Sequence, residues 1–575
     1  MLGVKTYQYL PLQEHEIRLV KLLPVTASFI KCEIVHVSLH SPGKYTALSY
    51  AWGDAENTRT IEVRTQSDPY DVQNRFVKVP VTISLRDGLR ALRKRDQIVM
   101  VWADALCIDQ QNPQERAQQV RLMTAIYQEA TSLAIWLGPT EDDSDMALES
   151  LEYIASHPNE IETLIRLPSF RPQLLAIASL FEREYWRRLW IVQKVLNTSD
   201  RYIYCGFKSP PVAWNSCLCA ARSFQGHGDL LIAAFPKGTR SGDQGSSHGL
   251  FTVSQSLLHL GPRSIEDIDS ITQVEKYSLL GIIRACRRKL CVDPRDKIFG
   301  ILGVLPDSMQ QDFHVDYSLS VREVYIDVVD YILHTTRRLD VICESIHFPH
   351  FTGSIDLPSW TPDWSHITNA TALGHIVRFT ASRTSEADFE FPDHPRRRRL
   401  AIRDVYVDTI VTRGIPVGTL VATSDYLLAF LEWRALLLDF IPQHNELSSE
   451  QLQQMFCETI CLGNVPDGIY GTKEWLTACY RLFASLIRYH LPKLALDDEL
   501  ENQINRNIDP ETWFMTVGDI VVVPLGCSTP IILRPGGRNG DYRFVGDAYI
   551  HGWMHGRAID ECKAGRRWKQ EYVLY

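Results

Sequence analysis

The chain has 575 residues, of which 45% are hydrophobic and 22% charged, and its formal net charge is −9. This composition suits packed globular domains and argues against a largely disordered chain. The acidic balance argues against general nucleic-acid binding, which needs a basic face. At roughly 100–200 residues per domain, the length predicts about three domains.

Thirteen cysteines are scattered along the chain without a Cys-x-x-Cys pair. Neither Cys217/Cys219 nor Cys457/Cys461 has further Cys or His partners at zinc-site spacing. A disulfide framework is unusual in a chain of this size, so reduced thiols and a cytoplasmic location are expected. We predict no metal site and no cofactor, since the residues also lack a phosphate-binding P-loop.

Two further patterns argue against a membrane span or a histidine metal site. The first residues carry charges and no apolar core of a signal peptide, and no apolar run approaches the 18 residues expected of a membrane helix. His551 and His555 are four residues apart, but Gly552 and Gly556 disfavour the helix that would align them. We expect neither feature.

The N-terminal third predicts alternating strands and helices. Residues 29–37 alternate apolar and polar side chains, and the runs 45–53, 99–104 and 133–137 are continuously apolar, as in buried strands. Between the last two runs, Asn112 suits a helix N-cap, Pro113 the first helical position and Glu115 a capping box. Strand, helix and strand in this order predict parallel pairing.

The remainder predicts helix first and strand later. A helix is expected over 185–196, mainly helical structure over 200–345, a mobile loop over 226–249 and helix again over 424–505. Residues 402–411 and 519–550 read as strands, and we expect these to pack together. The run Arg396–Arg399 predicts a solvated surface strip.

Three blocks of the chain resemble the heterokaryon incompatibility (HET) domain of fungi. They are Tyr45-Thr-Ala-Leu-Ser-Tyr-Ala-Trp-Gly-Asp54, the segment from Trp102-Ala-Asp-Ala-Leu-Cys-Ile-Asp-Gln-Gln to Trp136-Leu-Gly138, and Tyr185-Trp-Arg-Arg-Leu-Trp-Ile-Val-Gln193. Their order and distances are those of the family. Segments near 293–303, 316–318, 357–364, 518–527 and 542–552 resemble parts that follow the domain in many such proteins.

The resemblance implies an α+β fold with an N-terminal TIR-like α/β module and a mostly parallel sheet, a helical middle region and a β-rich C-terminal region. The domains implied are 1–200 for the HET domain, with its core motifs at 45–196, then 201–365 and 366–575. It also implies fungal non-self recognition, incompatibility or defence signalling, with self-association or a protein partner.

Some TIR-like domains cleave NAD with a glutamate, and in HET proteins the third block commonly ends Gln-Glu. Here the block ends Gln193-Lys194. A lysine would repel the oxocarbenium-like charge that develops during cleavage, where a carboxylate would stabilise it. The usual NAD-cleaving glutamate is therefore missing, and whether the chain is an enzyme stays open at this point.

Candidate site residues come from the three blocks. Asp104 follows a predicted buried strand, at the sheet edge where ligands bind in open α/β folds, although such a residue also commonly caps a loop. The catalytic candidates are Asp104, Cys107, Glu115 and Lys194, and the ligand-binding candidates are Tyr50, Trp52, Asp104, Asp109, Arg188, Trp190 and Gln193. Cys107 also reads as an inert buried thiol, Glu115 as a capping carboxylate, and Arg188 as an ion-pair partner of Asp104 or Asp109.

Two other functions remain as alternatives to signalling. The first is a small-molecule enzyme of fungal secondary metabolism that uses the aromatic-rich cleft of the fold for an apolar substrate, for instance in a cofactor-free cyclisation, where a pocket accelerates a step by positioning alone. Alternatively, another carboxylate, such as Glu182 or Glu184, would serve a degenerate NAD hydrolase.

Overall fold

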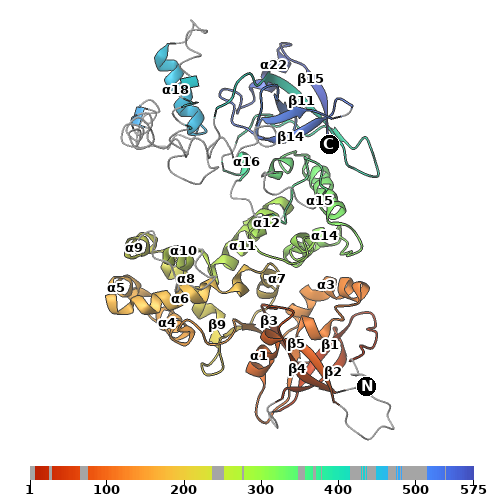
Figure 1. Ribbon diagram of the computed structural model, residues 1–575, viewed down its shortest axis with the longest axis vertical. Helices are drawn as coiled ribbons and strands as arrows, with labels where there is room; N and C mark the ends of the chain where they lie inside the picture. Colours follow the sequence, from red (N-terminus) through yellow and green to blue (C-terminus); the bar gives the residue numbers. More distant parts are fainter. Residues whose placement is uncertain are drawn as a thin grey trace. The chain divides into compact units, whose positions relative to one another are not determined.

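The computed structural model divides into two compact units, Met1–Ser320 and Val321–Tyr575. The structure describes residues 7–24, 29–64, 76–235, 251–274, 278–346, 356–366, 371–376, 379–414, 448–463, 515–537 and 539–575, and single positions between 429 and 481. Both units combine helices with a sheet (Figure 1). The predicted α+β class is therefore confirmed, while the domain boundaries at 200 and 365 stay a prediction.

A mixed sheet organises the N-terminal unit. Within the described residues its strands lie in the order β5-β4-β2-β1-β6-β3-β7-β8-β9. Their bounds are Glu16–Leu22 (β1), Lys31–Ser38 (β2), Thr46–Tyr50 (β3), Thr58–Arg64 (β4), Phe76–Thr82 (β5), Val99–Trp102 (β6), Ser132–Trp136 (β7), Arg201–Tyr204 (β8) and Val212–Ala213 (β9). Strands β2, β3, β6 and β7 confirm the strands predicted for this region.

Parallel pairing links β6, β3, β7 and β8, and also β2 with β4. The pairs β1–β2, β1–β6, β4–β5 and β8–β9 are antiparallel, so the sheet is mixed, with its longest parallel part running from β6 to β8. In chain order, β3, β6, β7 and β8 occupy the spatial order 2-1-3-4 of a doubly wound sheet. In such sheets, ligands bind beyond the carboxyl ends of the strands, which here are the ends at Tyr50, Trp102 and Trp136.

Helix α1 (Ile83–Leu92) lies between β5 and β6, and helix α3 (Pro113–Gln128) lies between β6 and β7. Helix α1 begins at Thr82, whose side chain accepts the Leu85 N–H, and it contacts β3. Helix α3 begins at Asn112, whose side chain accepts the N–H groups of residues 114 and 115. The predicted N-cap is therefore confirmed, and α3 packs against α7 (Ile191–Leu196).

The helix predicted over 185–196 is interrupted. A 3-10 turn spans Glu184–Arg187, Arg188 is extended with φ −75° and ψ 141°, and α7 begins only at Ile191. The reason is tertiary, because the Leu189 N–H donates to the Leu290 carbonyl and the Leu290 N–H donates to the Arg187 carbonyl. Backbone groups paired with a distant segment cannot also serve a continuous helix.

Helices dominate the chain after the sheet, as predicted. Their bounds are Ser144–Ser156 (α4), Ile161–Arg166 (α5), Arg171–Glu182 (α6), Trp214–Gln225 (α8), Gly228–Ala234 (α9), Val253–His259 (α10), Arg263–Val274 (α11), Leu279–Cys286 (α12), Asp296–Phe299 (α13), Asp307–Gln310 (α14) and Val321–Thr336 (α15). The loop predicted over 226–249 is wrong in its first part, because α9 buries Leu231. Its remainder, from 236 onward, lies outside the described residues.

A small closed barrel organises the C-terminal unit. Its strands are Phe389–Glu390 (β10), Leu400–Thr409 (β11), Ile520–Pro524 (β12), Ile531–Pro535 (β13), Tyr542–Asp547 (β14) and Lys569–Leu574 (β15). Strand β11 pairs with both β12 and β15, and β15 also pairs with β14, so β11 to β15 close on themselves. The expected packing of the last strands against residues 400–412 is confirmed.

Short helices accompany the barrel, namely Leu373–Ile376 (α16), Ser449–Ile460 (α18) and Arg557–Lys563 (α22). Apart from α18 and single positions, the helix predicted over 424–505 lies outside the described residues. The arginine run is not simply a solvated strip, because Arg397 pairs with Asp327 and Asp330, and Arg399 pairs with Asp541. The carboxylates that fix it come from segments far away in sequence.

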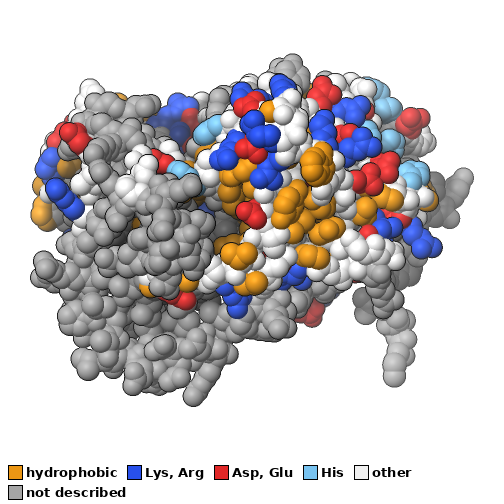
Figure 2. Space-filling view, turned by 90° about the horizontal axis from the view of Figure 1, so that it is seen from above, with side chains coloured by type: hydrophobic (Ala, Val, Ile, Leu, Met, Phe, Trp, Pro, Cys, Tyr) orange, Lys and Arg blue, Asp and Glu red, His pale blue; other side chains and the backbone are white. Residues whose placement is uncertain are grey.

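Apolar and charged side chains mix on the surface seen in Figure 2. The exposed large hydrophobic residues of the C-terminal unit include Val411, Met515, Val517 and Trp568. Among the described residues, no helix is both long and apolar enough to cross a membrane. Those residues also hold no group of three or more His, Cys, Asp or Glu side chains arranged for a metal ion.

One carboxylate is buried inside the barrel without a polar partner. Asp404 on β11 is 0% exposed, and no group in the described part of the chain hydrogen bonds to either of its carboxylate oxygens. Its strand neighbours are Pro524 on β12 and Gln570 on β15. Burial raises the pKa of Asp404 well above its ordinary value, so the neutral acid is the favoured form in the fold.

Replacing Asp404 by leucine is expected to stabilise the protein by about 1–3 kcal/mol at neutral pH, because the substitution removes a buried polar group that has no hydrogen-bond partner. The folded pKa lies above the unfolded value of 3.8, so the contribution of Asp404 to stability is greatest below 3.8 and falls as the pH rises. Urea unfolding from pH 4 to 7 should show this fall in the wild type and less of it in Asp404→Leu. Asp408→Leu, an exposed position on the same strand, should leave the pH dependence unchanged.

Candidate functional site

Asp104 lies immediately after β6, at the start of the short helix α2 (Asp104–Cys107), and its side chain is the centre of a buried polar cluster. The Lys194 Nζ lies 2.8 Å from Asp104 Oδ2. The Tyr50 hydroxyl donates to Oδ1 at 3.1 Å, and the Trp52 indole N–H donates to Oδ2 at 3.4 Å. The Ala105 N–H also donates to Oδ1. Both carboxylate oxygens are thus satisfied.

These contacts set the ionisation of the cluster. Burial alone would raise the pKa of Asp104, but the Lys194 ammonium, the Arg188 charge and the Tyr50 hydroxyl hold that pKa below its ordinary value of 3.8. Burial and the neighbouring Asp104 charge raise the pKa of Tyr50 well above 10. At neutral pH the cluster is therefore a carboxylate, an ammonium and a neutral phenol.

Lys194 reaches Asp104 from α7. Its side chain is only 3% exposed, and its ammonium also lies 5.7 Å from the centre of the Tyr127 ring. Position 194 is where the HET resemblance leads one to expect a glutamate. Two carboxylates at this separation could not both be ionised, whereas lysine converts the contact into an ion pair.

Arg188 and Trp52 lie at the less buried side of the cluster. The Arg188 guanidinium carbon is 5.9 Å from the Trp52 ring centre, a cation–π distance. Neither predicted ion pair, with Asp104 or with Asp109, is among the salt bridges of the described residues, although the Arg188 charge lowers the pKa of Asp104. Arg188 therefore acts on Asp104 at longer range.

Glu115 belongs to a second buried ion pair. Arg18 on β1, 0% exposed, donates to both Glu115 oxygens at 2.6 and 2.9 Å. The Asp109 N–H donates to Glu115 Oε1 at 2.7 Å, while the Asn112 N–H donates to the Asp109 carbonyl. The capping-box prediction for Glu115 is therefore wrong, because its carboxylate neutralises Arg18 and orders the loop before α3.

Cys107 lies between the two ion pairs. Its carbonyl accepts a hydrogen bond from Arg18, and its sulfur accepts the Ala103 N–H at 3.3 Å. Burial raises the pKa of the Cys107 thiol to about 12, which keeps the sulfur protonated at neutral pH. A protonated, fully buried thiol suits packing better than nucleophilic attack.

Trp190 and Gln193 face other partners. The Trp190 indole N–H donates to Asp296 Oδ2 at 3.1 Å, and the Gln193 amide donates to the Met123 sulfur at 3.6 Å. Asp296 also accepts the Tyr317 hydroxyl, and burial raises the pKa of Asp296 to about 6. The structure thus gathers Tyr50, Trp52, Asp104, Arg188 and Lys194, whereas Trp190 contacts the segment after α12 and Gln193 contacts α3.

The two alternative carboxylates lie apart from this cluster. Glu182 ends α6, is buried and accepts the Ser256 hydroxyl, whereas Glu184 is exposed. The residues that the sequence did not single out are Arg18, Tyr127 and Asp296. A signal for Arg18 was present, because it is an arginine amid the apolar residues of the strand Glu16–Leu22.

Replacing Lys194 by methionine should destabilise the protein by about 3–5 kcal/mol at pH 7, because Asp104 would be left buried without its cation. The wild-type pair stabilises the fold fully above pH 3.8, and this stability is lost as the pH falls through the lowered pKa of Asp104. In Lys194→Met the cation is gone, so burial raises the pKa of Asp104 above its value in the unfolded chain. Stability should then fall as the pH rises.

Urea unfolding of Lys194→Met, Asp104→Asn and the double variant measures the coupling. The double variant should be more stable than Lys194→Met alone. Additive losses would show that the two side chains do not interact. The exposed pair Arg166–Glu162 on α5 supplies a matched control, for which a cycle should give at most about 0.5 kcal/mol.

Comparison with known proteins finds similar sequences for part of the chain. Residues 45–194 match the family model described as heterokaryon incompatibility protein (HET). The chain is 26% identical over 408 residues to heterokaryon incompatibility protein 6, OR allele, of Neurospora crassa, an alignment covering 61% of this chain and 58% of the relative. No solved structure matches. The match ends at Lys194, the residue that closes the buried cluster, so residues 45–194 are similar to the HET domain.

Proposed function

We propose that this protein acts in heterokaryon incompatibility or a related defence response by assembling or binding a protein partner, and not by cleaving NAD. The observation that carries the proposal is the buried Lys194–Asp104 ion pair. NAD cleavage needs a carboxylate able to face the positive charge that develops on the ribose. Here a lysine occupies the expected position, and it already neutralises Asp104, the carboxylate of the buried cluster.

The fold and the alternative carboxylates support the same proposal. The 2-1-3-4 order of β6, β3, β7 and β8 supports a TIR-like module. Glu182 is engaged with Ser256, and Glu184 is exposed on the 3-10 turn before Arg188. Tyr50, an aromatic residue of the cluster, is packed in the interior and only 2% exposed. This burial gives little support to a cleft for a small apolar substrate.

Purified wild-type protein incubated with NAD should release no nicotinamide above the rate without protein. Lys194→Glu, combined with Asp104→Asn so that two carboxylates do not repel, tests whether position 194 alone disables cleavage. Lys208→Glu, an exposed lysine, is the matched control. Release by the wild type at a catalytic rate would refute the proposal. Gain in the double variant or silence in all the proteins would both agree with it, and circular dichroism establishes that each variant is folded.

An experiment in living cells tests signalling without NAD hydrolysis. Induced expression of the wild-type chain in a filamentous fungus should lower viable colony counts while total cellular NAD stays unchanged before viability falls. Asp104→Asn, which breaks the buried cluster, should weaken this effect. A drop in NAD that precedes loss of viability would contradict the proposal.

A further inference from the structure

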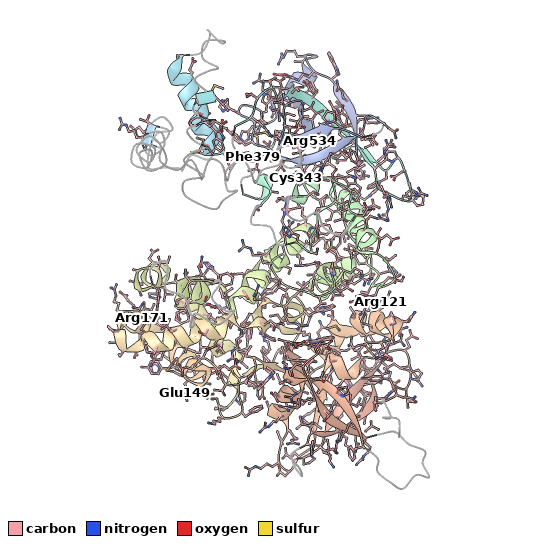
Figure 3. The ribbon with its side chains drawn as sticks, viewed as in Figure 1. Arg121, Glu149, Arg171, Cys343, Phe379 and Arg534 are labelled. Carbon is pink, nitrogen blue, oxygen red and sulfur yellow. The ribbon has the colours of Figure 1, made fainter. Side chains whose placement is uncertain are left out.

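Two buried thiols are in contact in the C-terminal unit. Cys343 lies in the 3-10 turn Ile342–Glu344, and Cys527 lies in the turn after β12. Their sulfur atoms are 3.7 Å apart, and the residues are 3% and 0% exposed (Cys343 is labelled in Figure 3). The two positions are 184 residues apart in sequence, so only the fold brings them together.

Backbone contacts hold the two turns in register. The Leu339 N–H donates to the Gly526 carbonyl at 2.9 Å, and the Ser528 N–H donates to Asp340 Oδ1 at 2.8 Å. The Ser382 hydroxyl donates to the Cys527 carbonyl at 2.6 Å. Because these bonds flank both cysteines, the two turns that carry them are held together. A disulfide requires the sulfurs to approach from 3.7 Å to about 2.05 Å.

We propose that Cys343 and Cys527 form a reversible intramolecular disulfide when the protein meets a hydroperoxide. The hydroperoxide O–O bond breaks as one thiolate sulfur attacks it, giving a sulfenic acid and one molecule of water or alcohol. The second thiol sulfur then displaces the sulfenic oxygen, which leaves as water. Two S–H bonds are lost, one S–S bond forms, and the two electrons and two protons go to the hydroperoxide.

The local chemistry sets the rate of this step. The adjacent Cys527 sulfur and burial raise the pKa of Cys343 well above its ordinary value, as do the nearby carboxylates Asp547 and Asp340. The thiolate is the reactive form, so oxidation is slow at neutral pH. While the pH stays below that pKa, the rate of oxidation rises roughly tenfold for each unit by which the pH is raised. Thr529 lies beside both sulfurs, with its hydroxyl 3.8 and 3.9 Å away.

Peptide mapping of the full-length wild-type protein tests the proposal directly. Reduced protein is treated with hydrogen peroxide, denatured, blocked with N-ethylmaleimide and digested without reductant. The expected result is a cross-linked peptide pair containing residues 343 and 527, with an intact mass lower by two hydrogens per chain and restored by dithiothreitol. Uncrosslinked peptides from both positions, or a cross-link between two chains, would overturn the proposal.

Thermal unfolding supplies an independent readout. Closing a long loop should raise the unfolding midpoint of the peroxide-treated wild type by several degrees over the reduced form. The shift should vanish in Cys343→Ser and Cys527→Ser and persist in Cys286→Ser, a buried cysteine of the N-terminal unit. A shift that persists in both test variants would refute the assignment. The wild-type mapping stays decisive if a serine variant does not fold.

Discussion

Charges buried in a protein are stable only when paired and hydrogen-bonded, and the N-terminal unit depends on one such pair between Lys194 and Asp104. The carboxylate stands at the carboxyl end of β6 and the ammonium comes from α7, so the pair ties the sheet edge to the last helix of the matched region. Tyr50 and Trp52 donate to the same carboxylate from the end of β3 and beyond. Removing either charge would leave the other in a site built to exclude water.

The position of α7 depends on a second constraint. Backbone pairing of residues 187–189 with Leu290 ends the preceding turn, extends Arg188 and lets the helix restart where Lys194 points at Asp104. A glutamate at the same place would face a carboxylate and demand a proton or a ligand. The lysine neutralises the carboxylate, so no proton or ligand is needed, and the ion pair holds α7 against the end of β6. A fold does not determine chemistry, and in the proposed function this one side chain accounts for the absence of NAD cleavage.

The C-terminal unit contains buried groups whose state depends on the medium. Strand β15 closes the barrel beside Asp404, and the burial of this carboxyl group makes its contribution to stability depend on pH. The turn after β12 brings Cys527 against Cys343, and in our proposal an oxidant joins the two sulfurs in a disulfide. In both cases burial shifts the pKa upward, so the uncharged acid and the uncharged thiol are the resting forms.

Local patterns in the sequence determined the strands at 46–50, 99–102 and 132–136, the Asn112 helix cap and the α+β class, because periodicity and capping act over a few residues. The sequence also marked Lys194 as a departure at a position of chemical interest. Its partner Asp104, the Arg18 partner of Glu115 and the break at Arg188 were decided by tertiary structure. Each depends on groups from segments about 90 to 100 residues apart, and no local pattern encodes which distant charge or backbone will arrive there.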